Sequence, residues 1–229
     1  MLLAAGRGTR MRDLTNDLPK PMIAVHGKPI LHHILEGLHQ AGIQRFLIVV
    51  GYRAEVVRDY FGDGSRFGAS IDYVTQVVQD GTGRVVELAR DFAGTQPFVL
   101  SYGDILVDPL NYRSLCNLQD AEALVSVKRN EQEMAKGGCV VVDDRFFLTD
   151  LIEKPAGPAP SPWYNAGIYT FRPSIFDYTA RLERSPRGEY ELTDAIRSLA
   201  QTSRNVRAVE LQGAWADVRD PEVLAALNA

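Results

Sequence analysis

The sequence predicts an α/β fold with a mostly parallel sheet and helices on both faces of that sheet. Three observations support this prediction. Short apolar runs typical of buried strands alternate with segments whose apolar residues recur at helical spacing. The first five predicted elements follow the order strand, helix, strand, helix, strand. The length of 229 residues, with 45% hydrophobic and 24% charged residues, suits one globular domain of this class.

The first half of the chain supplies the predicted parallel strands and their crossover helices. A short apolar strand at the start breaks into a loop that contains glycines. Residues 28–43 are predicted as a helix, because their apolar residues recur at helical spacing between Pro29 and Gly42. The other predicted elements of this half are strands at 46–50, 71–75 and 98–104, a helix through Val56, Val57 and Tyr60, and a helix at 84–92.

The second half is predicted to be rich in strands. Asp143 and Asp144 separate two apolar segments and are predicted to turn a hairpin. The predicted strands lie at 121–127, 136–142, 147–152 and 206–211, and predicted helices follow Glu189 and Pro221.

The loop after the first strand combines glycines with positive charge. Gly6 and Gly8 let the backbone come close to a ligand and turn its N–H groups toward an anion. Residues 1–29 hold five Lys or Arg and two acids, a balance of 5 − 2 = +3 in a chain whose formal net charge is −4. A basic loop on an acidic protein favours a small anionic ligand over a polyanion. The cations are Arg7, Arg10, Arg12, Lys20 and Lys28.

Two familiar phosphate-binding motifs are excluded. The dinucleotide-binding fingerprint needs a third glycine at the position that Met11 occupies, which argues against a dehydrogenase. The P-loop needs the sequence Gly-Lys-Ser or Gly-Lys-Thr, which does not occur in the chain.

Residues 3–10 (LAAGRGTR) and 19–21 (PKP) resemble the signature of the sugar-1-phosphate nucleotidyltransferases, in which L-A-A/G-G-x-G-T-R is followed about ten residues later by P-K-P. Asp13 departs from this pattern, because many members have proline there. The resemblance covers nearly the whole chain. It implies a Rossmann-like, three-layer α/β/α fold with a mostly parallel sheet and a β-rich sugar-binding portion. It also implies a single domain at 1–229, with the nucleotide-binding part mainly at 1–104 and the sugar-phosphate-binding part mainly at 105–229.

The resemblance assigns the nucleotide side of the site. It implies that Lys20 neutralises the α-phosphate and that Arg10 faces the departing pyrophosphate. The side-chain amide of Gln76 can donate and accept at once, as the edge of a pyrimidine requires. Arg84 departs from the small residue common in the family, which could alter the base pocket. The implied nucleotide-binding residues are Leu3, Ala4, Ala5, Gly6, Gly8, Thr9, Gln76, Gly81 and Thr82.

The remaining motifs are assigned to metal and sugar phosphate. Asp104 follows a buried strand in a Gly-Asp pair, and Asp217 stands in a Trp-x-Asp motif. The resemblance implies that both carboxylates bind Mg²⁺, a hard cation that prefers oxygen ligands. Glu153 is expected to accept hydrogen bonds from sugar hydroxyls. The implied sugar-phosphate-binding residues are Tyr102, Gly138, Glu153, Lys154, Asn165 and Trp215.

The implied reaction joins an NTP, with UTP or dTTP favoured, to a sugar 1-phosphate and releases pyrophosphate. One alternative is a cytidylyltransferase that acts on a non-sugar phosphate such as phosphocholine, for which Trp163, Tyr164 and Trp215 could supply aromatic rings. Another is a non-catalytic regulatory module of the same fold. The presence of Arg10 and Lys20 together with both metal carboxylates favours an enzyme.

The composition bears on location and partners. The apolar start is far shorter than a signal peptide, and no apolar run approaches the roughly 20 residues of a membrane span. Cys116 and Cys139 have no motif spacing, so we expect reduced thiols in a cytoplasmic protein. We expect no nucleic-acid or membrane partner, and a monomer or weak homodimer.

Overall fold

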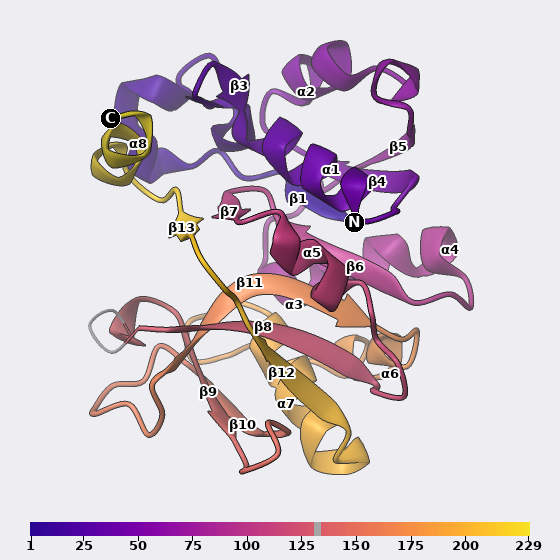
Figure 1. Cartoon of the computed structure of the whole chain (residues 1–229), viewed down its shortest axis with the longest axis vertical. Helices are drawn as coiled ribbons and strands as arrows, with labels where there is room; N and C mark the ends of the chain where they lie inside the picture. Colours follow the sequence, from indigo (N-terminus) through magenta and orange to yellow (C-terminus); the bar gives the residue numbers. More distant parts are fainter. Residues whose placement is uncertain (131–133) are drawn as a thin grey trace. The chain divides into compact units, whose positions relative to one another are not determined.

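The computed structural model describes residues 1–130 and 134–229. The chain forms two compact units, each built from segments that are distant in the sequence (Figure 1). Unit 1 contains the segments 1–79, 100–113 and 212–229, and unit 2 contains the segments 80–99 and 114–211. This division differs from the expected boundary at residue 104, because the chain enters unit 2 early and returns to unit 1 twice. The assignment of all 229 residues to a single domain stays a prediction.

Unit 1 contains a parallel sheet. The strands β1 (Leu2–Ala4), β4 (Arg45–Val50) and β5 (Ser70–Thr75) pair with one another in that order, and the end of β6 (Phe98–Tyr102) pairs with the other side of β1. Every residue of β4 after the first is buried, which is typical of a strand covered on both faces. The predicted α/β fold with a parallel sheet is therefore confirmed.

The helices of unit 1 connect these strands. The helix α1 (Ile30–Gln40) buries most of its apolar residues, and α2 (Ala54–Phe61) buries Val57 and Phe61. The predicted helix at 28–43 is too long at both ends. At its start, the short strand β3 (Lys28–Pro29) pairs with β2 (Ala24–Val25), and the extended ψ of Pro29 delays the helix until the next residue.

Four shorter elements follow β6 or lie near the C-terminus. The strand β7 (Ile105–Val107) pairs with β13 (Trp215–Asp217), which joins two segments more than 100 residues apart. The helix α8 (Pro221–Asn228) is capped by Asp220, whose side chain accepts a hydrogen bond from the Val223 N–H at 3.0 Å. The helix α5 (Leu110–Leu115) follows β7 along the chain.

Unit 2 carries the predicted β-rich portion, and most of its strand pairs are antiparallel. Strand β11 (Trp163–Phe171) pairs with both β8 (Ala123–Arg129) and β9 (Gly138–Val142), and β9 forms the predicted hairpin with β10 (Leu148–Glu153). One parallel pair, formed by β8 and β12 (Val206–Glu210), extends this set (Figure 1). At the turn of the hairpin, the Asp143 carboxylate accepts hydrogen bonds from two later backbone N–H groups.

The helices of unit 2 are α6 (Ile175–Thr179) and α7 (Leu192–Ser203), together with a broken helical segment. The single helix predicted at 84–92 is wrong, because the structure divides this segment into α3 (Thr82–Val85), a 3₁₀ turn at Val86–Ala89 and α4 (Arg90–Ala93). The junction of α3 and the 3₁₀ turn falls between two β-branched valines, which restrict helical side-chain rotamers.

Two further features concern location and chemistry. Within residues 1–130 and 134–229, no helix is both long and apolar enough to cross a bilayer. Cys116 and Cys139 are free thiols, and burial raises the pKa of both, to about 11 for Cys116.

Gly37 provides a test of packing in unit 1. A Cβ at this position of α1 would lie 2.3 Å from the Tyr112 ring, and Tyr112 is only 2% exposed, so the ring cannot move away. Gly37→Ala should therefore lower the free energy of unfolding by about 1 to 3 kcal/mol, although alanine favours helix. Gly157→Ala is the matched control, because its Cβ would meet open space. Denaturant unfolding of both variants measures the difference; equal stabilities would contradict this account of α1.

Candidate active site

The parallel sheet of unit 1 places two predicted motifs at one edge. Strand β1 lies between β4 and β6, so the strand order reverses on either side of β1. Leu3 is opposite Tyr102, and the Gly103 N–H donates to the Leu3 carbonyl at 3.0 Å. The basic loop and Asp104 therefore both leave the sheet at the carboxyl ends of adjacent strands. Open parallel sheets bind ligands at such a reversal.

Two glycines allow this close approach. A Cβ on Gly103 would lie 2.3 Å from the Leu3 carbonyl oxygen and 3.0 Å from the Pro21 ring. Gly8 has a φ of +72°, and a Cβ there would lie 2.6 Å from the Cβ of Lys20. The Lys20 side chain consequently lies across Gly8. The spacing of the two sequence motifs thus has a physical cause, because the first motif forms the surface on which Lys20 rests.

Lys20 lies between the two predicted metal-binding carboxylates. Its Nζ is 2.5 Å from Oδ2 of Asp104 and 4.0 Å from Oδ1 of Asp217. The Lys20 side chain is 12% exposed, and both carboxylates are about a quarter exposed. The β7–β13 ladder holds the carboxylates together, because the Val218 N–H donates to the Asp104 carbonyl at 2.9 Å. The structure thus brings together three predicted residues from distant parts of the sequence.

The electrostatics of this group favour a cation. Burial raises the pKa of Asp217 to about 6, and the nearby charge of Asp104 acts in the same direction. Lys20, Arg219 and Arg10 oppose this rise without cancelling it. A pair of oxygen-donating carboxylates suits a hard divalent cation. In the described part of the chain no group of three or more His, Cys, Asp or Glu residues is suited to metal, so water and phosphate oxygens would complete the coordination.

The basic loop itself is open to ligand. Gly6 has no heavy atom within 4 Å of an added Cβ, and Thr9 and Arg10 are exposed. The carbonyl of Ala5 accepts hydrogen bonds from the Tyr52 N–H at 3.1 Å and from Nε2 of Gln79 at 2.9 Å. The predicted nucleotide-binding residues Leu3 and Ala4 form the last part of β1 and lead directly into this loop.

Gln76 and Gln79 follow β5 in unit 1. Gln76 is half-buried, and its Nε2 donates to the Val78 carbonyl at 3.1 Å. Gln79, which the sequence analysis did not single out, contacts the basic loop directly. Its signal in the sequence is weak, since one amide in a polar loop has no motif of its own. The predicted role of Gln76 in base recognition stays a prediction.

Gly81 and Thr82 belong to unit 2, where both contact the start of α7. Gly81 has a φ of +120°, and its Cβ would lie 2.4 Å from the Tyr190 carbonyl oxygen. The Thr82 hydroxyl accepts a hydrogen bond from the Leu192 N–H at 3.3 Å. The guanidinium of Arg84 lies 3.8 Å from the centre of the Tyr190 ring. These contacts give the glycine-threonine motif a structural role, and the expected nucleobase contact stays a prediction.

Three of the predicted sugar-binding residues lie together in unit 2. Glu153 at the end of β10 is opposite Gly138 at the start of β9. A Cβ on Gly138 would lie 3.0 Å from the Cβ of Asn165, so only glycine leaves this surface open. Nδ2 of Asn165 donates to the Tyr169 hydroxyl at 2.8 Å, whereas its buried Oδ1 has no hydrogen-bond partner among residues 1–130 and 134–229. A buried acceptor without a partner is costly, and a ligand hydroxyl would satisfy it.

Arg187 was not predicted and lies against Glu153. Its Nη1 is 3.5 Å from Oε1 of Glu153 and 3.2 Å from Oε1 of Glu191, and its Nη2 is 3.4 Å from Oε2 of Glu189. Burial raises the pKa of Glu153, as does the charge of Glu191, while Lys154 and Arg187 oppose the rise. Only the fold could reveal this contact, because Arg187 is 34 residues from Glu153 and lies in a surface turn.

The remaining predicted residues are divided between the units. Lys154 is exposed and has a φ of +45°, a conformation rare for a residue with a Cβ. Tyr102 and Trp215 were predicted in one group with Glu153, but they lie in unit 1 at the ends of β6 and β13, close in sequence to Asp104 and Asp217. Both are half-buried.

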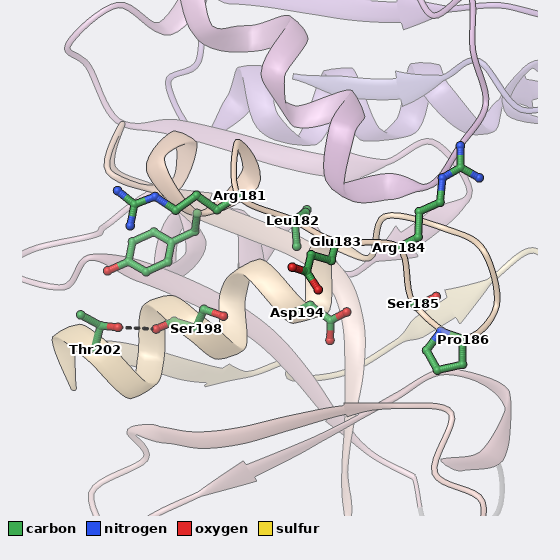
Figure 2. A pocket seen from close by; sticks show the side chains of 10 residues that line it. Arg181, Leu182, Glu183, Arg184, Ser185, Pro186, Asp194, Ser198 and Thr202 are labelled. Atoms are coloured by element: carbon green, nitrogen blue, oxygen red, sulfur yellow. Dashed lines mark hydrogen bonds between the residues drawn. The ribbon is translucent and has the colours of Figure 1, made fainter.

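A separate pocket of about 520 Å³ lies in unit 2 and contains none of the predicted site residues. Figure 2 shows its lining, in which the segment after α6 faces one side of α7. That side of α7 carries Asp194, Ser198 and Thr202, one turn apart from each other.

Comparison with known proteins assigns the family. The sequence profile described as "Nucleotidyl transferase" matches residues 1–229, and the chain belongs to this family. The family predicted from the two N-terminal motifs is thereby confirmed.

The similar proteins include two whose names refer to a sugar phosphate or to glycan biosynthesis. The chain is 36% identical over 227 residues to a Haloferax volcanii protein named UTP–glucose-1-phosphate uridylyltransferase AglF, covering 97% of this chain and 91% of AglF. It is 33% identical over 230 residues to the low-salt glycan biosynthesis nucleotidyltransferase Agl11 of the same organism, covering all of this chain but 64% of Agl11. The chain spans about half the length of several other curated relatives.

A solved structure agrees with this relationship. A Bacillus anthracis protein described as a candidate glucose-1-phosphate thymidylyltransferase superposes with a TM-score of 0.88 at 27% sequence identity. The match covers 99% of this chain and 92% of that protein. The predicted nucleotidyltransferase fold is therefore confirmed along almost the whole chain.

The raised pKa of Glu153 predicts a pH-dependent stability. The folded protein holds the Glu153 proton more tightly than the unfolded chain, so this carboxyl costs stability once it ionises. Relative to wild type, Glu153→Gln should gain stability as the pH rises above about 4.3, the ordinary pKa of glutamate, and the gain should level off above the raised value. Denaturant unfolding between pH 4 and 8 measures it. Glu189→Gln, at another contact of Arg187, should change less; a pH-independent difference for Glu153→Gln would contradict the prediction.

Proposed function

We propose that this chain transfers a nucleotidyl group from an NTP to a sugar 1-phosphate, which yields an NDP-sugar and pyrophosphate. The observation that carries the proposal is Lys20 between Asp104 and Asp217 at the carboxyl edge of a parallel sheet. The family and its sugar-1-phosphate relatives support the same reaction.

The chemistry needs no protein nucleophile. A phosphate oxygen of the acceptor attacks the α-phosphorus of the NTP, and pyrophosphate leaves in line. Lys20 neutralises charge at the α-phosphate, and Arg10 neutralises charge on the pyrophosphate. Such preorganised positive charge is the main source of catalysis in phosphoryl and nucleotidyl transfer. Asp104 and Asp217 would hold Mg²⁺, which when bound supplies further positive charge to the phosphates.

The sugar is assigned to the residues around Glu153 in unit 2. Glu153 and the free Oδ1 of Asn165 accept hydrogen bonds from hydroxyl groups, and the missing side chain of Gly138 leaves room for them. Lys154 and Arg187 supply positive charge for the phosphate of the acceptor. Tyr102 and Trp215 stay predicted sugar-phosphate contacts.

The nucleobase is assigned to Gln76, Gly81 and Thr82, with UTP or dTTP favoured. The printed names of the relatives support this preference, since one is a uridylyltransferase and a solved neighbour is described as a candidate thymidylyltransferase. Ala4, Ala5 and Gly6 lie beside the same nucleotide in this proposal. A cytoplasmic location, a monomer or weak homodimer, and the lack of nucleic-acid and membrane partners stay predictions.

The alternative acceptor is a non-sugar phosphate such as phosphocholine. Its trimethylammonium group offers no hydroxyl to satisfy Asn165 or Glu153. The buried, unpaired Oδ1 of Asn165 therefore favours a sugar acceptor. A non-catalytic module would have no need for Lys20 and both carboxylates in one charged group.

A pyrophosphate-release screen tests the proposal. The purified chain is incubated with Mg²⁺, each of five NTPs (ATP, CTP, GTP, UTP and dTTP), and a panel of sugar 1-phosphates, with phosphocholine as an additional acceptor. We expect release that requires both substrates, with UTP or dTTP and a hexose 1-phosphate. Release with CTP and phosphocholine alone would replace the sugar by the alternative acceptor, and no release with any pair would contradict enzymatic activity.

Lys20→Ala should lower kcat by about 10² to 10³, because it removes one preorganised charge from the transition state. The fold should persist, since Lys20 lies in a short 3₁₀ turn at Lys20–Met22, outside the sheet. Lys28→Ala is the matched control: Lys28 pairs with Glu36 at 2.6 Å in the same unit, and its loss should leave turnover nearly unchanged. Steady-state kinetics and circular dichroism of both variants measure the two effects. A Lys20→Ala enzyme with at least half the wild-type turnover would exclude the α-phosphate role.

Removal of Mg²⁺ should abolish turnover, and its readdition should restore it. Asp104→Asn and Asp217→Asn should each raise the Mg²⁺ concentration for half-maximal activity by more than about ten-fold, because each removes a negative ligand. Asp72→Asn, at an exposed position of β5, is the control. Activity is followed during titration of Mg²⁺ into EDTA-treated protein. Full turnover in excess EDTA would show that the two carboxylates serve another purpose.

A further inference from the structure

The basic loop of unit 1 is held at both ends by one residue outside it. The loop, defined here as residues 5–17, carries the exposed Arg7, Arg10 and Arg12, and Met11 and Thr15 are its buried residues within 9–15. Tyr52 follows β4 and contacts the loop at its beginning and at its end.

A backbone N–H and a side-chain O–H of Tyr52 make this connection. At the beginning of the loop, the Tyr52 N–H donates to the Ala5 carbonyl at 3.1 Å. At the end of the loop, the Tyr52 hydroxyl lies 3.1 Å from the Thr15 carbonyl and 2.6 Å from the Asn16 carbonyl. The next residue adds an ion pair, because Nη2 of Arg53 is 3.2 Å from Oδ1 of Asp17. One dipeptide therefore closes the loop.

The interior of the loop depends on the end that Tyr52 holds. Thr15 is 1% exposed, and its hydroxyl lies 3.2 Å from the carbonyls of both Gly8 and Arg12. Arg12 has a φ of +54°, a strained conformation that persists only where surrounding contacts impose it. If the chain at Thr15 moved, these two contacts would be lost together. The position of Thr15 thus sets the path of residues 8–12.

The aromatic ring of Tyr52 adds a contact to a charged side chain of the loop. The guanidinium of Arg7 lies over the ring, 5.2 Å from its centre. A Cβ on the preceding Gly51 would lie 2.7 Å from the Ala5 carbonyl oxygen, so glycine is needed for Tyr52 to reach the loop. The contact surface therefore includes the backbone, the hydroxyl and the ring of one tyrosine.

We propose that Tyr52 is a positioning residue that holds residues 7–12 in the conformation that receives the triphosphate of the nucleotide. Without this anchor, the exposed and charged residues of the loop would become ordered only when the nucleotide binds. The conformational entropy lost in that step would weaken binding. The identity of the ligand rests on the proposed function, whereas the effect of Tyr52 on the loop does not. The two parts can be tested separately.

Tyr52→Phe is the test variant, because it removes only the hydroxyl, whose single O–H donor is shared between the Thr15 and Asn16 carbonyls. Tyr73→Phe is a closely matched control in the same unit. The Tyr73 hydroxyl also donates to a backbone carbonyl, that of Gly62 at 2.7 Å, and the guanidinium of Arg58 lies 4.7 Å from the centre of its ring. Tyr73 has none of these contacts with the basic loop, so the control separates loop positioning from the general loss of a tyrosine hydroxyl.

The first measurement is native-state proteolysis with trypsin, which cleaves after arginine. Arg7, Arg10 and Arg12 are all exposed, and the cleavage rate follows the population of opened loop. In Tyr52→Phe, cleavage after these arginines should be up to about ten-fold faster than in wild type, on the usual worth of one hydrogen bond. Inorganic pyrophosphate with Mg²⁺ should slow this cleavage. Tyr73→Phe should match wild type.

The second measurement is the KM for each substrate. In Tyr52→Phe, the KM for the NTP should rise about ten-fold while the KM for the sugar 1-phosphate stays within two-fold of wild type. A purely structural role would shift neither KM selectively. Circular dichroism confirms that both variants are folded.

The outcomes distinguish the two proposals. Faster cleavage confined to Tyr52→Phe supports the role of Tyr52 in the loop even when wild type shows no turnover, which would remove the proposed function alone. Unchanged cleavage and unchanged KM values in Tyr52→Phe overturn the positioning role even when wild type is active. Equal acceleration in Tyr73→Phe also overturns it, because the effect would then be a general loss of stability.

Discussion

The charge balance around Lys20 is the constraint on which unit 1 depends. Two carboxylates, Asp104 in the turn between β6 and β7 and Asp217 at the end of β13, are held within reach of a single ammonium group. Burial and mutual repulsion raise the pKa of Asp217 to about 6, so the group is electrostatically incomplete without additional positive charge. In the proposed function, Mg²⁺ supplies this charge and the substrate phosphates share it.

The backbone around that group is shaped by close packing. Gly103 allows β6 to end against β1, and Gly8 allows Lys20 to lie across the loop. The two sequence motifs that carry Gly8 and Lys20 are therefore parts of one surface, which explains why they occur at a fixed separation. Tyr52 also holds this backbone in place, because its hydroxyl contacts the Thr15 and Asn16 carbonyls of the loop.

Unit 2 contains a second polar group, formed around Asn165 and Glu153. Among the described residues the buried Oδ1 of Asn165 has no hydrogen-bond partner, and burial raises the pKa of Glu153. Arg187 partly compensates for the charge of Glu153 and its neighbours. The two units thus differ in chemistry: unit 1 presents cations together with the two carboxylates that we propose to hold the metal, whereas unit 2 presents hydrogen-bond acceptors, which could bind hydroxyl groups.

Local sequence determined the family and the types of strand and helix, because motif spacing and apolar periodicity are local properties. It also singled out Lys20 as a cation in a loop, and Asp104 and Glu153 as acids at the ends of strands. It overextended the helix before Ala41 and joined α3 to α4, since helix ends and breaks depend on packing as well as on propensity. Only the tertiary structure decided that β13 pairs with β7 to bring Asp217 to Asp104, that Arg187 reaches Glu153, and that Tyr52 closes the basic loop. These contacts join residues 34 to more than 100 positions apart, and no local pattern encodes such a distance.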